Sequence, residues 1–219
     1  MDRSEIPNSS HSSVNYKSVF KCILFNAQSL CNKPCDLDYL LCTAKPDLFF
    51  VTETWLTRDV TNGMLDRHGA YHIYRADRNS KGGGVAIFCH KSLRSSQINV
   101  DTVFSTLEVV NIQVVHGCSV FNFINVYRPP GVDDVSKAYT SVLVKYLQQV
   151  CVCDSKLKNI IVGDFNLRDI DWTSGECPCD DINFPFYSVV TELGFIQFVS
   201  SATRDSSFKY SILFLLMIH

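Results

Sequence analysis

The chain has 219 residues with a formal net charge of −2 at neutral pH, and 46% of its residues are hydrophobic. This length suits one large α/β domain, and the near-neutral charge excludes a generally basic protein that coats nucleic acid, while a local basic surface stays open. The longest apolar run, residues 212–218, is far shorter than the ~20 residues that a membrane helix needs, so we expect no membrane association.

The N-terminal segment and the cysteines indicate an intracellular protein. Residues 1–17 are polar and Ser-rich without the apolar centre of a secretory signal, and we expect a disordered lead-in there. Several of the ten cysteines lie in apolar runs, where a thiol acts as a small hydrophobe. The pairs at 151/153 and 177/179 are too closely spaced for a zinc knuckle. We therefore expect a reduced protein of the nucleus or cytoplasm.

The first ordered part of the chain is expected to alternate strand, helix and strand. Residues 20–25 form an apolar run that is typical of a core strand, and Asn26 follows it. The apolar residues within 37–44 lie on one face of a helix. A second buried strand over 47–52 ends at Glu53. Each of these two strands thus ends in a polar residue.

A basic, glycine-containing segment comes next. Residues 57–70 show no clear period and predict a surface connection, while 71–75 predict a short strand. The charged segment 75–81 is followed by three glycines at 82–84 and by a predicted strand over 85–89. Because a strand follows the glycines, and no Gly-Lys-Ser/Thr ending is present, we reject a phosphate-binding P-loop and expect a flexible hairpin bend.

The middle of the chain predicts a hairpin and a helix. Two β-rich runs, 107–115 and 118–126, are separated by His116-Gly117, which fits a tight turn. The second run ends at Tyr127, where two prolines stop the strand. The apolar period over 139–150 is the strongest helical pattern in the sequence.

The stretch around residues 160–166 is the first candidate for chemistry. Residues 160–162 form a β-branched run typical of a strand buried on both faces, and Asp164 and Asn166 follow it. A buried strand holds its end with little freedom, as a catalytic carboxylate requires. The alternative is that the two side chains only form an Asx-type turn. A short helix over 186–193 and a strand over 195–199 complete the pattern.

Five polar side chains therefore stand at or just after predicted strand ends: Asn26, Glu53, Tyr127, Asp164 and Asn166. Because core strands bring distant ends together, we expect these residues on one rim of stacked sheets. Each also has a simpler explanation, with Glu53 as a helix-start carboxylate, Asn26 as a cap and Tyr127 as a core aromatic residue.

Five motifs, in the same order, resemble those of the endonuclease/exonuclease/phosphatase superfamily. They are Asn26-Ala-Gln-Ser29, Thr52-Glu-Thr-Trp-Leu56, Gly82-Gly-Gly-Val-Ala-Ile87, Asn125-Val-Tyr-Arg-Pro-Pro130 and Gly163-Asp-Phe-Asn166. The sequence is most similar to the apurinic-type endonuclease domain of non-LTR (LINE-like) retrotransposons. The resemblance covers about residues 19–204, and we place the domain at 18–204.

The resemblance implies an α/β (α+β) fold, a four-layered sandwich of two packed β-sheets flanked by helices, and metal-assisted hydrolysis of a DNA phosphodiester. Glu53 would ligate Mg²⁺ or Mn²⁺ with Asn26 beside it, because a hard cation prefers oxygen ligands. Asp164 would orient or deprotonate the attacking water, Asn166 would hold the phosphate or that aspartate, and Tyr127 would donate to the phosphate. We expect a monomer, and the polyprotein of such an element normally carries a reverse transcriptase domain.

The sequence departs from the family pattern after Thr203-Arg204. The family continues with a Leu-Asp-Leu strand and an Asp-His motif, whereas residues 205–219 form a divergent apolar tail. His219 follows Ile218 rather than an aspartate, so we assign it no catalytic role. We therefore expect a truncated copy that misses its last strands and is impaired in activity.

Two further functions stay open at this stage. The same scaffold serves phosphatases that act on small phosphoesters, and a non-catalytic remnant would bind the DNA backbone without cutting it. In such a remnant the contacts would come from basic residues, and binding would weaken steeply with salt. The candidates are Arg58, Arg67, Arg75, Arg78, Lys81 and Arg128. A run of charges such as 75–81 also forms a solvated loop without any partner.

Overall fold

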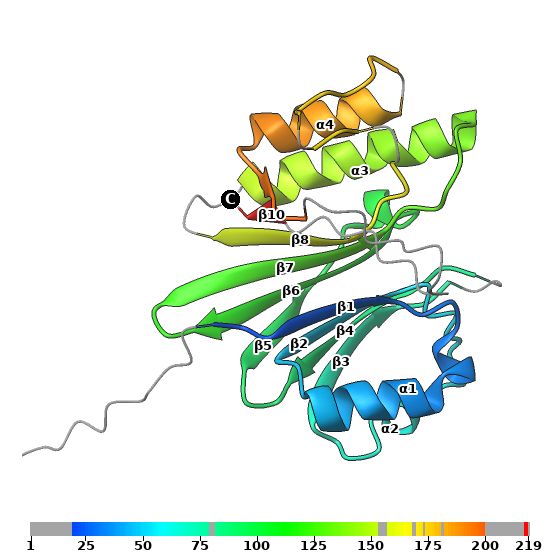
Figure 1. The fold of residues 1–219 in the computed structure, drawn as a ribbon, viewed down its shortest axis with the longest axis vertical. Coiled ribbons are helices and arrows are strands. Elements are labelled where there is room, and N and C mark those ends of the chain that lie inside the picture. Colours follow the sequence, from blue (N-terminus) through cyan, green and yellow to red (C-terminus); the bar gives the residue numbers. More distant parts are fainter. Residues whose placement is uncertain are drawn as a thin grey trace, which may run out of the picture.

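Two β-sheets face each other at the centre of the molecule, and helices cover the outer side of each sheet (Figure 1). This arrangement comes from a computed structural model, which describes residues 19–78, 82–152, 157–167, 170–172, 174–180, 182–199 and 217–218. The layers follow the order helix, sheet, sheet, helix. The predicted four-layered sandwich is confirmed.

The smaller sheet has four strands in the order β1-β2-β4-β3. Its strands are β1 (Cys22–Asn26), β2 (Leu48–Thr52), β3 (Tyr71–Ala76) and β4 (Val85–His90). β1 and β2 are parallel, while β4 is antiparallel to both β2 and β3. The parallel pair requires a crossover, and the segment between β1 and β2 supplies it on the outer face.

The larger sheet has six strands in the order β5-β6-β7-β8-β10-β9. Its strands are β5 (Arg94–Ile98), β6 (Glu108–His116), β7 (Ser119–Tyr127), β8 (Lys158–Asp164), β9 (Ile196–Gln197) and β10 (Met217–Ile218). β7 and β8 are parallel, and the other neighbours are antiparallel. The long β6–β7 hairpin and β8 form the centre of this sheet.

The helices lie on the two outer faces. α1 (Pro34–Tyr39) continues into the π-helix η2 (Leu40–Ala44) and, with α2 (Asn62–Leu65), covers the four-stranded sheet. α3 (Asp134–Val152) and α4 (Asn183–Glu192) cover the six-stranded sheet (Figure 1). Two 3-10 turns are η1 (Leu30–Asn32) and η3 (Thr102–Phe104). Within the described part of the chain, no helix combines the length and the apolar character that crossing a membrane requires.

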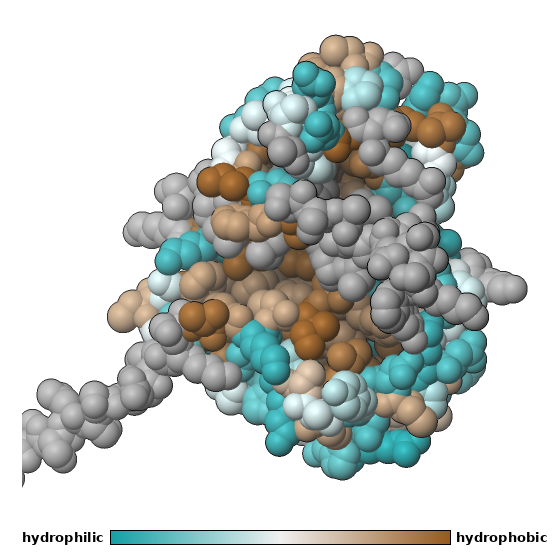
Figure 2. Space-filling model, in the orientation of Figure 1, coloured by the Kyte–Doolittle hydropathy of each residue, from teal (hydrophilic) through white to brown (hydrophobic). Residues whose placement is uncertain are grey.

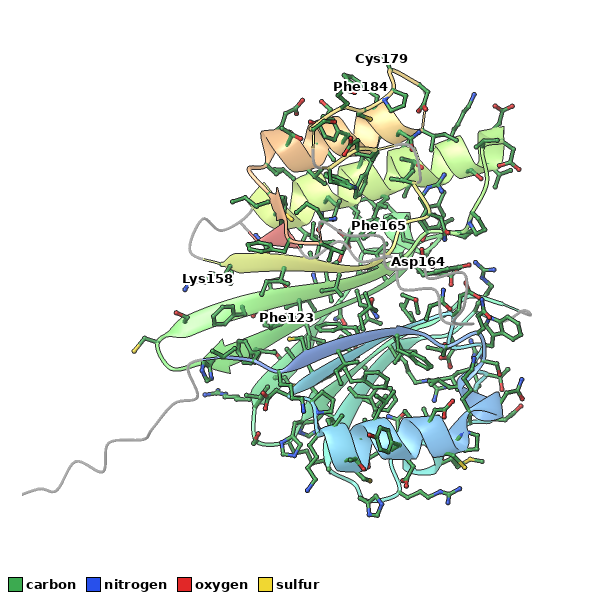
Figure 3. The ribbon with its side chains drawn as sticks, in the orientation of Figure 1. Phe123, Lys158, Asp164, Phe165, Cys179 and Phe184 are labelled. Atoms are coloured by element: carbon green, nitrogen blue, oxygen red, sulfur yellow. The ribbon has the colours of Figure 1, made fainter. Side chains whose placement is uncertain are left out.

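Strands buried on both faces explain the continuous apolar runs of the sequence. Along β2, Leu48 and Phe50 belong to the core between the sheets, whereas Phe49 and Val51 pack with the α1 side. Phe123 of β7 likewise points into the space between the sheets (Figure 3). Apolar side chains gather between the two sheets in the space-filling view, with hydrophilic residues above and below (Figure 2). The hydrophobic effect thus holds four layers through three contiguous cores.

Most predicted elements are present, and the differences have local causes. β5 was not predicted because Arg94–Ile98 is a polar, half-exposed strand at a sheet edge. The predicted surface connection 57–70 contains the short α2. β1 is only partly buried because it too is an edge strand, and the strand expected over 195–199 shortens to β9.

The expectations for the two ends fall mostly on residues outside the described part. The lead-in 1–17 lies outside it, as do residues 205–216 and His219 of the apolar tail. Met217 and Ile218 form β10, which pairs with Ile161 and Ile160 of β8 on one side and with β9 on the other. This short strand joins the tail to the six-stranded sheet.

Candidate active site

The strand ends that the sequence singled out meet on one rim of the two sheets. Asn26 is the last residue of β1, and Glu53 directly follows β2 in the four-stranded sheet. Tyr127 and Asp164 are the last residues of β7 and β8 in the six-stranded sheet. Because β1 and β2 are parallel, and β7 and β8 are parallel, each pair of carboxyl ends lies at the same edge.

One side-chain amide joins the two sheets at this rim. The Nδ2 atom of Asn26 donates to Oε1 of Glu53 over 3.0 Å and to Oδ2 of Asp164 over 2.9 Å. Since both oxygens lie within 3.0 Å of one nitrogen, they are at most about 6 Å apart. Asn26 and Asp164 are buried, whereas Glu53 is half-buried. Asp164 lies between the two sheets where β8 ends (Figure 3).

The sheets are fastened together just inside the rim. Asn125 of β7 donates from Nδ2 to the backbone oxygens of Val51 and Ala86, at 3.0 Å and 2.9 Å, and these residues belong to β2 and β4. A buried amide that satisfies carbonyls of the opposite sheet fixes the separation and register of the two sheets. Glu53 and Tyr127 lie two residues further along, so their positions relative to each other are fixed.

The backbone around Glu53 is held from both sides. Its carbonyl accepts a hydrogen bond from the Ser29 amide at 3.0 Å, and the next two amides donate to Gly84 and Gly83 at 3.1 Å and 2.9 Å. Glu53 has a φ of +50°, a left-handed conformation that costs free energy for a residue with a Cβ. This conformation persists because the neighbouring hydrogen bonds determine it.

Further left-handed residues lie in the loops of the same rim. Among the described non-glycine residues with positive φ, Gln28 and Ser29 follow β1, Trp55 follows β2, and Asn166 follows β8. Strained backbone tends to gather at functional sites, where the surrounding structure maintains it. The cluster at three neighbouring strand ends therefore points to the same rim as the carboxylates.

Tyr127 places a neutral hydroxyl beside the carboxylates. It pairs with Asp164 in the β7–β8 register, so the two side chains stand on the same face of the sheet. Burial raises the pKa of its hydroxyl well above the ordinary value, and Glu53, Asp164 and Glu108 raise it further, while Arg78 opposes them. Tyr127 is therefore protonated at neutral pH and acts as a hydrogen-bond donor.

Asn166 and Arg128 stabilise the loops rather than the open rim. Asn166 is half-buried, and its Nδ2 donates to the Arg128 carbonyl at 2.8 Å. Arg128 itself is 0% exposed, and its guanidinium donates to Thr140 Oγ1 at 2.9 Å and to the Gly131 carbonyl at 3.2 Å. This corrects the expectation that Arg128 contacts DNA, because a fully buried, internally bonded guanidinium presents no charge to a polyanion.

The predicted basic loop is also partly engaged within the protein. Arg75 contacts Asp77 at 2.6 Å and the carbonyl of Val60 at 2.6 Å, and only 14% of its side chain is exposed. Arg78 forms an ion pair with Glu108, and its guanidinium carbon lies 6.0 Å from the centre of the Tyr127 ring. Lys81 lies outside the described residues. Of the described candidates in this loop, Arg78 is the one beside the rim.

Glu108 is a site residue that the sequence interpretation missed. It begins β6, pairs with Tyr127 in the hairpin, and accepts hydrogen bonds from Arg78 and from the Gly84 amide. Gly83 has a φ of +67°, which favours glycine, and a Cβ there would displace the ends of the Glu108 and Arg78 side chains. The signal was available, because counting back along the predicted hairpin from Tyr127 leads to the start of the other strand.

The donor set at the rim fits a hard divalent cation. The carboxylates of Glu53 and Asp164 and the side-chain oxygen of Asn26 are all oxygen donors, the type that Mg²⁺ and similar ions prefer. The Oδ1 atom of Asn26 is buried and has no hydrogen-bond partner within the described structure, which leaves it free as a ligand. A buried acceptor without a partner costs free energy unless something satisfies it, and a cation does so.

The fold and the rim define a class of α/β-sandwich hydrolases with an acidic site at the strand ends. The model of the Endonuclease/Exonuclease/phosphatase family matches residues 24–189, and the chain belongs to this family. Members of the family are metal-dependent nucleases and phosphatases. No curated protein matches the sequence.

Several solved structures share the fold at low sequence identity. An AP endonuclease from Archaeoglobus fulgidus has a TM-score of 0.65 and 20% identity, covering 91% of this chain and 86% of that chain. The 3′ phosphatase NExo from Neisseria, bound to a product DNA hairpin, has a TM-score of 0.65 and 15% identity over the same shares. The endonuclease domain of TRAS1, a telomere-specific non-LTR retrotransposon, has a TM-score of 0.63 and 14% identity, covering 91% and 85%.

Proposed function

We propose that this chain is a divalent-metal-dependent phosphodiester hydrolase that nicks DNA, the endonuclease domain of a non-LTR retrotransposon. The observation that carries the proposal is the Asn26 amide, which holds Glu53 of one sheet and Asp164 of the other within about 6 Å. Two carboxylates brought so close would suit a divalent cation, whose charge would offset theirs. Family membership and DNA-processing structural neighbours support the choice of DNA as substrate.

Each rim residue has a part in the proposed reaction. Glu53 and Asn26 would hold Mg²⁺ or Mn²⁺, which would neutralise the charge that develops on the phosphate oxygens. Asp164 accepts the proton of the attacking water, whose oxygen bonds to phosphorus as the bond to the leaving oxygen breaks. Tyr127 stays protonated and donates a hydrogen bond to a non-bridging phosphate oxygen. Asn166 holds the loop that directly follows Asp164, through its bond to the Arg128 carbonyl.

Protonation of the leaving oxygen is the slow step of the proposed reaction. The four histidines of the described residues, His68, His72, His90 and His116, lie away from the rim, near the α1 side or at the opposite strand ends. None of them stands beside Asp164 to serve as a general acid. We therefore propose that the described rim by itself turns over slowly, because general acid catalysis commonly contributes about 10²–10⁴ in rate.

A plasmid-nicking assay tests the proposal. Supercoiled DNA is incubated with the full chain and Mg²⁺ or Mn²⁺, beside the variants Asp164→Asn and Asp101→Asn. Asp101 is an exposed aspartate outside the rim and serves as the matched control. We expect metal-dependent nicking that Asp164→Asn reduces by at least about 100-fold and Asp101→Asn leaves unchanged. Equal nicking by all three proteins would reject catalysis at this rim.

The same experiment separates the competing functions. A protein that shifts DNA in a gel in a salt-sensitive manner but never nicks it is a DNA-binding remnant. Release of phosphate from a small phosphoester or from a 3′-phosphate end, without plasmid nicking, indicates a phosphatase. Both outcomes contradict the nicking proposal while leaving the family assignment intact.

A further inference from the structure

A second group of metal-ligating side chains lies on the outer face of the four-stranded sheet. Asp38 of α1, Cys42 of η2 and His68 of the connection between α2 and β3 offer one ligand atom each, and these atoms all lie within 4.8 Å of one another. Oδ1 of Asp38 is 3.6 Å from Nε2 of His68 and 3.7 Å from Sγ of Cys42. It is the one such group of three within the residues that the structure describes.

The spacing of these atoms suits a tetrahedral ion. Zn²⁺ is bound at about 2.0–2.2 Å by nitrogen and oxygen and at about 2.3 Å by sulfur, so neighbouring ligand atoms of a tetrahedron are about 3.3–3.7 Å apart. Two of the three separations already fall at this value, and a small side-chain movement closes the third. We propose that Asp38, Cys42 and His68 form a zinc site that is separate from the active-site rim.

The backbone holds the three ligands toward one point. Asp38 and Cys42 are four residues apart on continuous helix, so their side chains lie on the same face. His68 stands inside a hydrogen-bonded turn from Asp66 to Gly69 (3.2 Å), and Oδ2 of Asp66 accepts the Tyr71 amide at 2.7 Å. The turn is thus anchored to β3, and His68 has only its side chain to adjust.

The ligand types select the class of ion. Thiolate and imidazole together favour Zn²⁺ and related transition metals over Mg²⁺ or Ca²⁺, which take oxygen ligands. The side chains of His68 and Asp38 are 64% and 57% exposed, so an ion reaches the site from solvent and a water fills the fourth position. A bound ion would link η2 to the connection between α2 and β3, and it would stabilise the outer helical layer.

Cobalt spectroscopy tests the site independently of nuclease activity. Co²⁺ replaces Zn²⁺ in such sites, and a thiolate ligand gives a charge-transfer absorption in the near ultraviolet. The full chain, kept reduced, is titrated with Co²⁺ alone. We expect one equivalent to produce the band, Zn²⁺ to remove it by displacement, and Cys42→Ser to abolish it. Asp38→Asn and His68→Asn should each weaken Co²⁺ binding by at least about tenfold, since even outer-shell partners contribute that much.

Two control variants make the assignment specific. Cys118→Ser removes an exposed cysteine far from the cluster, in the β6–β7 hairpin, and should leave the band unchanged. Glu53→Gln should also leave it unchanged, because the rim offers oxygen ligands only, so failure of the nuclease proposal would not affect this test. The proposal is overturned if the wild-type chain gives no thiolate band, if Cys42→Ser retains it, or if His68→Asn, at an exposed position, binds Co²⁺ as tightly as the wild type.

Discussion

Replacing Asn26 by alanine is the sharpest test of the bridge between the two sheets. The substitution removes the one nitrogen that donates to both Glu53 and Asp164. A hydrogen bond to a charged group contributes about 1.5–3 kcal/mol to stability, and its loss matters most for the buried Asp164. We expect Asn26→Ala to lower the free energy of unfolding by about 2–4 kcal/mol at pH 7.

The loss should depend on the metal. Because Asn26 is one of the proposed ligands, millimolar Mg²⁺ at pH 7 should stabilise the folded wild type more than the variant, so the difference between them should grow. Urea unfolding at pH 7, with and without Mg²⁺, measures this effect.

Asn122→Ala is the matched control. Asn122 is also a buried asparagine, and its Nδ2 donates to Oδ1 of Asn159 at 2.8 Å, so the variant loses a hydrogen bond without leaving any charge unpaired. Its cost should be independent of Mg²⁺. If Asn26→Ala behaves in the same way as Asn122→Ala, the two carboxylates do not share a site, and the reasoning from the bridge is wrong.

Three further predictions concern other parts of the molecule. Gly163→Ala should yield no stably folded protein, because φ is +154° there and a Cβ would overlap the backbone of Val126 on β7; soluble expression with a cooperative unfolding transition contradicts this. Arg128→Met should lower the free energy of unfolding, measured in urea, by about 3 kcal/mol or more, because backbone carbonyls lose their hydrogen-bond donor. Unchanged stability together with weaker DNA binding would instead indicate that Arg128 acts at the surface. Burial raises the pKa of Tyr71 to about 12, so the stability that its neutral hydroxyl contributes is complete below about pH 10 and is lost as the pH rises toward 12. Tyr71→Phe should therefore flatten the fall in unfolding free energy at alkaline pH, and an unchanged slope contradicts this.

Strand prediction succeeded where local pattern and burial agree. β2 and β4 are apolar at nearly every position, β8 contains the apolar run 160–162, and the structure buries these residues. β5 escaped prediction because its sequence, Arg94–Ile98, is polar, and its pairing with β6 decides its conformation. An apolar pattern in the sequence reports burial, and an edge strand has few buried side chains.

The candidate site was predictable in part for a similar reason. Strand ends such as Asn26, Glu53 and Asp164 were visible as polar residues after apolar runs. The function of Arg128 was not visible, because a charged residue after a strand looks exposed in sequence, and only packing against Thr140 and the loop carbonyls showed it to be buried. The hairpin register places Glu108 opposite Tyr127, but its contacts with Arg78 and Gly84 come from the loop between β3 and β4, which no local pattern shows.

The amino-acid sequence by itself determined which segments form buried strands and which polar side chains follow them, because apolar periodicity and the residues that end a strand act over a few neighbouring positions. Tertiary structure alone decided which of those side chains share a site. Asn26 and Asp164 are 138 positions apart, and their contact depends on how two sheets stack face to face. That stacking is set by the packing of whole strand faces, here fastened by Asn125, and no local pattern encodes it.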